Sequence, residues 1–174
     1  ATGESGYVRF LARKDGIPTL RLDPSPQAEA GYILARHPQE RLFVFYLLRE
    51  VVRLRDRKGL KPEAARGAIE GMLAHAAAFG LNSSFTFDDF ERAYQTHLGD
   101  PKAWWDAPGW WFDPLPRNDE KWTHQINRDS SELRNRHFFE VLTASVRAGH
   151  RVFAAVGRNH VPMIAAALRC ELGG

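Results

Sequence analysis

The last third of the chain contains a short apolar segment between two amphipathic stretches. Residues 152–156 read Val-Phe-Ala-Ala-Val and are apolar at every position. A strand buried in a parallel sheet shows this continuous pattern, because helices cover both of its faces. The stretch from Asp129 to Gly149 and the stretch from Pro162 to Leu172 have helical periodicity. The pattern therefore predicts a helix, a buried strand and a second helix.

Other segments extend this prediction to the whole chain. Residues 17–23 form a second expected strand, and Asp129 with Glu132 resembles a capping box that begins the helix after residue 128. A chain of 174 residues can bury a real core as one domain. We expect a single helix-rich α/β domain over residues 1–174, with a small, largely parallel sheet covered by helices on both faces. The further helices are expected over residues 4–14, 24–37, 38–57, 62–79 and 86–97.

Residues 99–122, called the Trp segment below, differ from the rest of the chain. All five tryptophans of the protein lie here, among prolines and glycines. A loop of this length is usually a lid, a binding loop or an excursion. Trp110 and Trp111 are candidates to stack against a substrate or to close over a site. The alternative is that the tryptophans pack down as a satellite core.

Composition narrows the classes of partner. The net charge of +3 allows anionic ligands, but no basic run alternates with aromatic residues, so we expect no nucleic acid. No apolar stretch is long enough to span a membrane, and no secretory signal is visible. Cys170 is the single cysteine, which excludes an internal disulfide. We expect a soluble protein, cytoplasmic or exported after signal removal, since the chain begins at Ala1 rather than Met. The pattern does not specify an oligomeric state.

Residues 157–160, Gly-Arg-Asn-His, follow the expected buried strand. In open α/β sheets, ligands bind outside the carboxyl ends of strands. Gly157 would allow a tight turn, and Arg158 and Asn159 are candidates to bind a substrate. His160 could bind a metal through one nitrogen or act as an acid or base near neutral pH. The alternative is an ordinary turn glycine followed by a polar residue at a helix start.

Arg134 is the second candidate for a catalytic role. It lies four residues before Phe138, so helical spacing directs it along the buried stripe. Its guanidinium could clamp an anion or stabilise an oxyanion, and Asn135 beside it has a weaker claim to bind a substrate. The alternative, favoured for Arg134 alone, is a structural ion pair or snorkelling at the helix start. For Asp23 we favour an N-cap before Pro24.

Three more polar residues lie on apolar helix faces. Tyr46 and Arg49 are one turn apart in the most apolar helix and need hydrogen-bond partners, which favours bracing over a place in the site. Glu4 lies at the start of the first helix, where the helix dipole favours a carboxylate. A cap is the simple interpretation of Glu4, and a metal ligand or general base is the sharper one.

Several of these residues match a known family. The run Leu133-Arg134-Asn135-Arg136, the apolar segment and the motif Gly157 to His160 resemble the C-terminal part of the TraB/PrgY/GumN family. That family is related to the TIKI proteases and, more distantly, to erythromycin-esterase-like and ChaN-like proteins. The opening residues 3–18 and the run 45–49 also look similar. Gly157 and His160 match the second GxxH motif of the family, and its first GxxH motif is not in this chain. We expect either that the strand and loop carrying the first motif lie outside this chain or that the chain is a truncated member.

The resemblance implies a metal-dependent hydrolase of peptide or ester bonds. His160 and Glu4 would be metal ligands, with His160 or Glu4 also available as acid or base, and Arg134 would stabilise the oxyanion. The implied cofactor is a divalent metal ion (Mn, Co or Zn), and the implied partner is a small-molecule or peptide substrate. The alternative function is a non-catalytic domain on the same scaffold that binds a small molecule, a peptide or haem. A weaker alternative is an interaction module that uses the Trp segment.

Overall fold

The computed structural model describes residues 3–79, 81, 84–114 and 120–173, with only the backbone for Glu4 and Phe79. Helices make up its regular secondary structure, and none of the described residues belongs to a strand. The predicted α/β fold, with a largely parallel sheet covered on both faces, is therefore wrong, and the described chain is all-α. The elements are α1 (Gly3–Lys14), α2 (Pro26–Leu34), α3 (Gln39–Lys58), α4 (Pro62–Leu73), η1 (Ala76–Phe79), α5 (Phe87–His97), η2 (Trp104–Asp106), η3 (Gly109–Phe112), α6 (Trp122–Arg147) and α7 (His160–Leu172).

Both expected strands are segments without regular structure. Residues 17–22 and 151–157 lie outside every helix, and most of their side chains are exposed. A strand exists only where a neighbouring strand takes its backbone hydrogen bonds, and the backbone–backbone hydrogen bonds of these segments to other described residues are the cap of α1 at Ile17 and the turn from the His160 N–H to the Gly157 carbonyl. The predictions of a strand over residues 17–23 and of a buried strand over residues 151–156 are therefore wrong for the described part of the chain.

The described chain divides into two compact units. The central unit comprises Ser25–Ser130, and the terminal unit comprises Ala1–Pro24 with Ser131–Gly174. Helix α6 contributes its first residues to the central unit and the rest to the terminal unit. The prediction of one domain over residues 1–174 stays a prediction.

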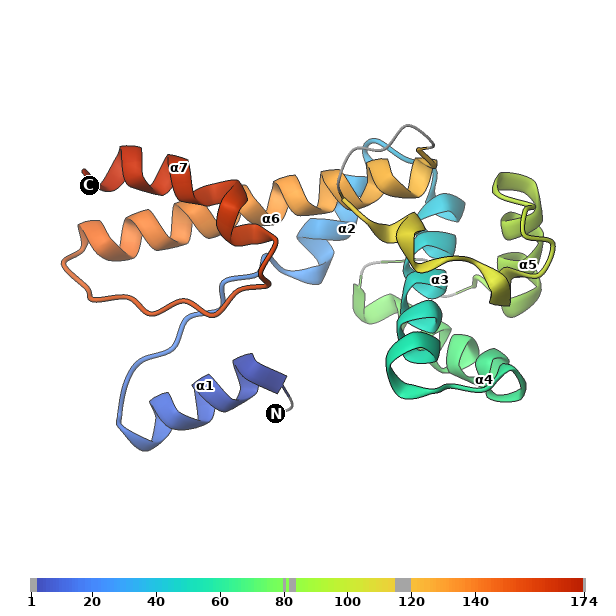
Figure 1. Ribbon diagram of the computed structural model, residues 1–174, viewed down its shortest axis with the longest axis horizontal. Coiled ribbons are helices and arrows are strands. Elements are labelled where there is room, and N and C mark those ends of the chain that lie inside the picture. Colours follow the sequence, from blue (N-terminus) through green and yellow to red (C-terminus); the bar gives the residue numbers. More distant parts are fainter. Residues whose placement is uncertain (1–2, 80, 82–83, 115–119, 174) are drawn as a thin grey trace. The chain divides into compact units, whose positions relative to one another are not determined.

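The central unit is built around α3, which packs against α2, α4, α5, η2 and η3 (Figure 1). Eight residues of α3 are buried, which agrees with a helix that is apolar nearly all round. Val44 and Leu48 are fully buried, and the α4 and α5 residues Ile69 and Phe90 fill the same interior. Gly59 ends α3 with a φ of 67°, a left-handed conformation that glycine adopts without strain.

The Trp segment packs onto this core. Trp111 is buried, and the other described tryptophans are partly buried against the same cluster. Three consecutive carbonyls of η3 accept hydrogen bonds from the start of α6: Trp110 from His124 Nε2 (2.9 Å), Trp111 from Thr123 Oγ1 (2.7 Å) and Phe112 from Asn127 Nδ2. These bonds hold the first turns of α6 in place.

Those contacts explain why α6 begins earlier than predicted. The helix starts at Trp122, so Asp129 lies within it, and the predicted capping box of Asp129 and Glu132 is wrong. Asp129 instead accepts from His37 Nε2 at 2.6 Å. At α5, by contrast, Thr86 and Asp89 do form a capping box.

The terminal unit has few buried apolar side chains. Helix α7 runs beside the later part of α6 (Figure 1), and Phe138 and Ile164 are the large apolar residues buried there among those described. Gly149 follows α6 with a φ of 83°, the left-handed conformation that a glycine adopts just after a helix.

Candidate functional site

His160 is the first residue of α7 in the terminal unit. Its backbone N–H donates to the Gly157 carbonyl at 2.9 Å, which closes the turn formed by residues 157–160. The side chain is 8% exposed, although its neighbours on both sides are exposed. Burial of an imidazole at an otherwise open helix start implies that other side chains hold it there.

Asn135 of α6 is the residue that holds the ring. His160 Nδ1 lies 2.6 Å from Asn135 Oδ1, and Asn135 Nδ2 donates to Met163 Sδ at 3.2 Å. An amide oxygen can only accept, so His160 Nδ1 carries the proton in this pair. The neutral ring then has an unprotonated Nε2, the form that binds metals and accepts protons.

The other ring nitrogen of His160 is not used in this hydrogen bond. Nε2 of His160 makes no hydrogen bond to another described residue. The arrangement therefore gives the largely buried His160 a basic Nε2 of fixed orientation that no other described residue occupies.

The environment of His160 favours its neutral form. The pKa of His160 is lowered, first by burial and then by the charge of Arg134, and Asp23 opposes these effects. Phe138 contributes to the burial, with its ring edge-on at 5.0 Å between centroids. A lowered pKa keeps the imidazole unprotonated at neutral pH, which both a metal ligand and a general base require.

Arg134 is paired rather than buried. Its Nε donates to Asp23 Oδ1 at 2.8 Å, an Nη atom lies at the same distance, and its side chain is 31% exposed. The guanidinium carbon is 5.6 Å from the centre of the Phe138 ring. The Arg134 side chain thus lies near Phe138 of the apolar stripe, as expected, but its guanidinium is paired with Asp23 instead of being buried. The favoured alternative, a structural ion pair, describes what is seen.

Asp23 does not have its expected role. Ser25 is the N-cap of α2, and its hydroxyl accepts from the Ala28 N–H at 3.1 Å. Asp23 is therefore available to Arg134, a pairing between residues 111 positions apart that no local pattern could reveal.

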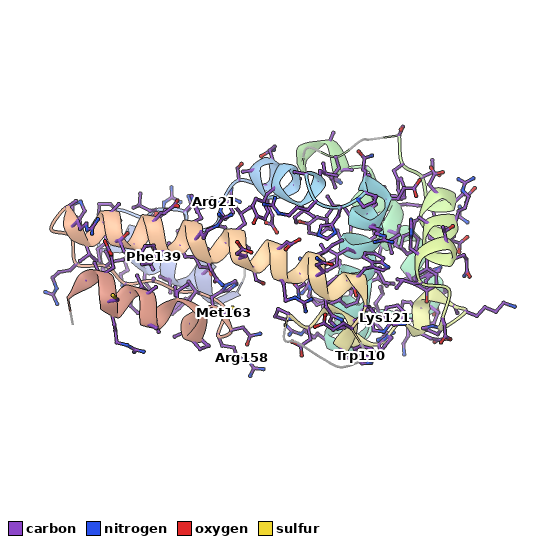
Figure 2. All side chains as sticks on the ribbon, turned by 90° about the horizontal axis from the view of Figure 1, so that it is seen from above. Arg21, Trp110, Lys121, Phe139, Arg158 and Met163 are labelled. Carbon is purple, nitrogen blue, oxygen red and sulfur yellow. The ribbon has the colours of Figure 1, made fainter. Side chains whose placement is uncertain are left out.

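The remaining candidates of the terminal unit differ in how they are placed. Asn159 is the N-cap of α7, and its side chain makes no capping hydrogen bond. Figure 2 shows Arg158 projecting from the turn before α7. Gly157 has no positive φ, and a Cβ there would meet His160 Cδ2 at an ordinary 3.5 Å, so the turn does not require glycine. The side chain of Glu4 lies outside the described residues.

Four further candidates belong to the central unit. The hydroxyl of Tyr46 donates to Glu29 Oε1 at 3.2 Å, and Arg49 lies over the rings of Phe45 and Tyr46, at 5.0 and 5.5 Å from their centres. These contacts agree with bracing between helices. Trp110 stacks on His124, and Trp111 is buried. The structure thus joins Arg134, Asn135 and His160 in one cluster and assigns the other four to the central core.

A polar cluster of the central unit was missed in the sequence. Glu29 Oε1 also accepts from the Ser130 hydroxyl at 2.5 Å, and His37 pairs with Asp129 one residue earlier on α6. The sequence indicated that Tyr46, on an apolar helix, needs a hydrogen-bond partner. It could not identify Glu29 as that partner, because Glu29 lies in a different helix. These bonds brace α2 and α3 against the start of α6.

A metal site needs several converging ligands. Among the described residues, no three His, Cys, Asp or Glu side chains come together as a potential metal site, and His160 Nε2 is one donor.

Within the described part of the chain, no helix is long and apolar enough to cross a membrane. Scans against protein-family models and searches of curated proteins and of solved structures find no match to this chain. The resemblance to the TraB/PrgY/GumN family therefore stays a prediction.

Proposed function

We propose that the chain is part of a hydrolase of the TraB/TIKI-like class, acting on a peptide or ester bond, with His160 at its reacting centre. The observation that carries the proposal is the hydrogen bond from His160 Nδ1 to Asn135. That bond fixes the tautomer and the direction of Nε2, as the residue that orients a catalytic histidine must do. The lowered pKa of His160 supports the same role, because the base must be neutral to accept a proton.

The chemistry assigned to these residues is proton transfer from water. Nε2 of His160 accepts a proton from the water that attacks the carbonyl carbon, while Nδ1–H stays hydrogen-bonded to Asn135 Oδ1. The charged ring then gives its Nε2 proton to the leaving amine or alkoxide as the C–N or C–O bond breaks. Arg134 supplies positive charge to the developing oxyanion if the substrate displaces Asp23 from it. Until a substrate binds, the ion pair with Asp23 neutralises the positive charge of Arg134.

Metal dependence is a separate part of the proposal. A bound Mn, Co or Zn ion would polarise the scissile carbonyl and lower the pKa of water. The described residues offer one suitable donor, His160 Nε2, and do not by themselves fit a complete metal site. Glu4 is the second proposed ligand. The roles of His160 and Asn135 as base and orienting residue do not require the ion.

A matched set of variants tests this function. Hydrolysis of p-nitrophenyl acetate and of a fluorogenic peptide mixture is measured with and without Mn, Co or Zn. We expect His160→Ala to lower kcat about 100-fold or more and Asn135→Ala about 10-fold. His150→Ala is the control, since His150 is an exposed histidine of the same unit. Equal turnover by wild type and His160→Ala would contradict the assignment.

A second candidate function is a non-catalytic ligand-binding domain. The ion pair of Arg134 with Asp23 favours it, because a paired guanidinium recognises an anion by exchanging one carboxylate for another. Calorimetric titration with acetyl-amino acids and with haem distinguishes the two functions. Binding that Arg134→Met abolishes, without turnover of any substrate tested, would favour this candidate.

A further inference from the structure

Met163 of α7 contacts the pair formed by Asn135 and His160. Residues three positions apart in a helix share one face, so Met163 and His160 both reach Asn135 of α6. Asn135 Nδ2 donates to Met163 Sδ at 3.2 Å, while Asn135 Oδ1 lies 2.6 Å from His160 Nδ1. Figure 2 labels Met163 near the start of α7. The sulfur is thus linked to the imidazole ring through a single amide group.

The sulfur determines which way the amide of Asn135 faces. A thioether can accept a hydrogen bond but cannot donate one, so it holds the Nδ2 end of the amide. The Oδ1 end then faces His160 and accepts from Nδ1–H. A neutral ring carries one proton, so Nε2 is left unprotonated. Met163 therefore sets the tautomer of His160 through the amide of Asn135.

Met163 is open to oxidants. It is 43% exposed, whereas Met72, the other methionine of the chain, is partly buried against the core of the central unit. A peroxide transfers one oxygen atom to a thioether: the O–O bond breaks, an S–O bond forms, and hydrogen peroxide leaves as water. The sulfur loses two electrons, and the peroxide gains them. Methionine sulfoxide reductases reverse the change, so the modification can regulate a site.

Oxidation changes how the sulfur acts on Asn135. The distance of 3.2 Å between Nδ2 and Sδ leaves no room for an oxygen atom between them, so the new oxygen projects elsewhere. A sulfoxide sulfur carries a positive partial charge, because oxygen withdraws its electrons, and it repels the N–H groups of Nδ2. A half-turn of the amide removes this repulsion, since Oδ1 then faces the sulfur and Nδ2 faces His160. Nδ1 must now accept, so the ring proton moves through water to Nε2.

We propose that Met163 is a peroxide-sensitive modification site whose oxidation moves the ring proton of His160 from Nδ1 to Nε2. A neutral ring with a protonated Nε2 cannot accept a proton there, so oxidation removes the general base. This effect on turnover rests on the hydrolase proposed above. The tautomer of His160 does not depend on that function.

NMR measurement of the His160 tautomer tests the proposal. Long-range nitrogen–proton correlation spectra at neutral pH show which ring nitrogen carries the proton. All samples carry Cys170→Ser, since the exposed Cys170 would also react with peroxide. We expect Nδ1–H to predominate in untreated protein. Hydrogen peroxide should raise the ratio of the Nε2–H to the Nδ1–H tautomer about 10-fold, the effect of exchanging one hydrogen bond, and methionine sulfoxide reductases should restore it.

Two leucine variants in the same background are the matched controls. Met72→Leu keeps Met163 and should respond to peroxide as the parent protein does. Met163→Leu has no sulfur to hold Nδ2 of Asn135. Its tautomer ratio should therefore exceed that of the untreated parent before peroxide is added, and peroxide should not change it. Far-UV circular dichroism should show equal helix content in both variants, since leucine is a strong helix former.

Peptide mass spectrometry identifies the oxidised methionine in each sample. An unchanged His160 tautomer in protein with oxidised Met163 would overturn the proposal. So would oxidation of Met72 before Met163, a peroxide response in Met163→Leu, or a Met163→Leu ratio equal to that of the untreated parent. Hydrolysis is measured in the same samples, and turnover should fall with the fraction of the Nδ1–H tautomer. Absence of hydrolysis in untreated protein would contradict the proposed function and leave the tautomer result standing.

Discussion

The central and terminal units differ in where their apolar side chains lie. In the central unit, α3 collects side chains from α4, α5 and the Trp segment into one buried cluster. In the terminal unit, the large apolar residues that are buried among those described are Phe138 and Ile164, whereas many others face solvent. A burial difference of this size implies that the central unit carries most of the stability of the isolated chain, because burial of apolar area is the main favourable term in folding.

The candidate site follows the same division. His160, Asn135 and Arg134 lie in the terminal unit, where packing is sparse, and the most densely bonded polar groups lie in the central unit. Functional residues often occupy the less stable part of a protein, since a site optimised for chemistry is not optimised for packing. The predictions below test this contrast.

The largest expected effect comes from emptying the central core. Phe45 is fully buried, so Phe45→Ala should lower the free energy of unfolding by about 3–5 kcal/mol. Phe153→Ala removes the same atoms from an exposed position and should change it by less than about 0.5 kcal/mol in dilute protein. Urea unfolding followed by circular dichroism measures both. Similar losses for the two variants would show that the units do not differ in this way.

A smaller effect is expected from His124, which is buried in the central unit. Its Nδ1 accepts from the Lys121 N–H at 2.8 Å, and its Nε2 donates to the Trp110 carbonyl at 2.9 Å. His124→Ala leaves both partners unsatisfied and should cost about 2–4 kcal/mol. His150→Ala should be nearly neutral in the same urea experiment. A neutral His124→Ala would mean that the Trp segment is held without these bonds.

The pH dependence of His160 tests the terminal unit. The folded state lowers the pKa of His160 below its ordinary value of 6.5, first through burial. The unfolded chain therefore binds more protons at mildly acidic pH, and stability rises with pH through that window. The stabilising contribution is complete above about pH 6.5 and is lost as pH falls towards the folded pKa. Unfolding free energies at pH 5 and pH 7.5 should thus differ more for wild type than for His160→Gln.

A direct titration complements that comparison. The ring protons of His160, followed by NMR, should titrate below the ordinary histidine value of 6.5, because burial lowers the pKa of this side chain. A higher titration point for His160 would contradict the burial argument and the neutral tautomer in the proposed mechanism.

The smallest expected effect on stability comes from Arg134. Its partner Asp23 is 50% exposed, and exposed ion pairs contribute little, so Arg134→Met should cost less than about 1 kcal/mol. If Arg134 serves catalysis, the same variant should lower kcat while the unfolding free energy barely changes. A double-mutant cycle with Asp23→Asn measures the pair itself. A large coupling would mean that the ion pair is structural.

Helices were the part of the fold that local sequence could predict. The Thr86 and Asp89 capping box, the terminating Gly59 and the buried face of α3 all act over a few residues, and the sequence displays them directly. The start of α6 was missed because Thr123, His124 and Asn127 bond to carbonyls of η3, 12 to 15 residues earlier in the chain. Local propensity contains no information about such partners.

The candidate site was predictable in part for the same reason. His160 was selected from the turn before an expected helix, and the structure shows that helix, whereas its partner Asn135 is 25 residues away and the partner of Arg134 is 111 residues away. The prediction that Arg134 points along an apolar stripe used helical spacing alone. Its charged end departs from the stripe because Asp23, from a distant part of the chain, offers a closer electrostatic partner.

The sequence by itself determined which segments of this protein favour helix and which favour an extended chain, because those preferences arise from sterics and capping within a few residues. Tertiary structure alone decided that the extended segments 17–22 and 151–156 form no sheet in the described chain, since a strand depends on hydrogen bonds from a neighbour. It also decided that the Trp segment joins the core of the central unit and that Asn135 orients His160. These outcomes depend on which distant groups meet, and that is fixed only when the chain is folded.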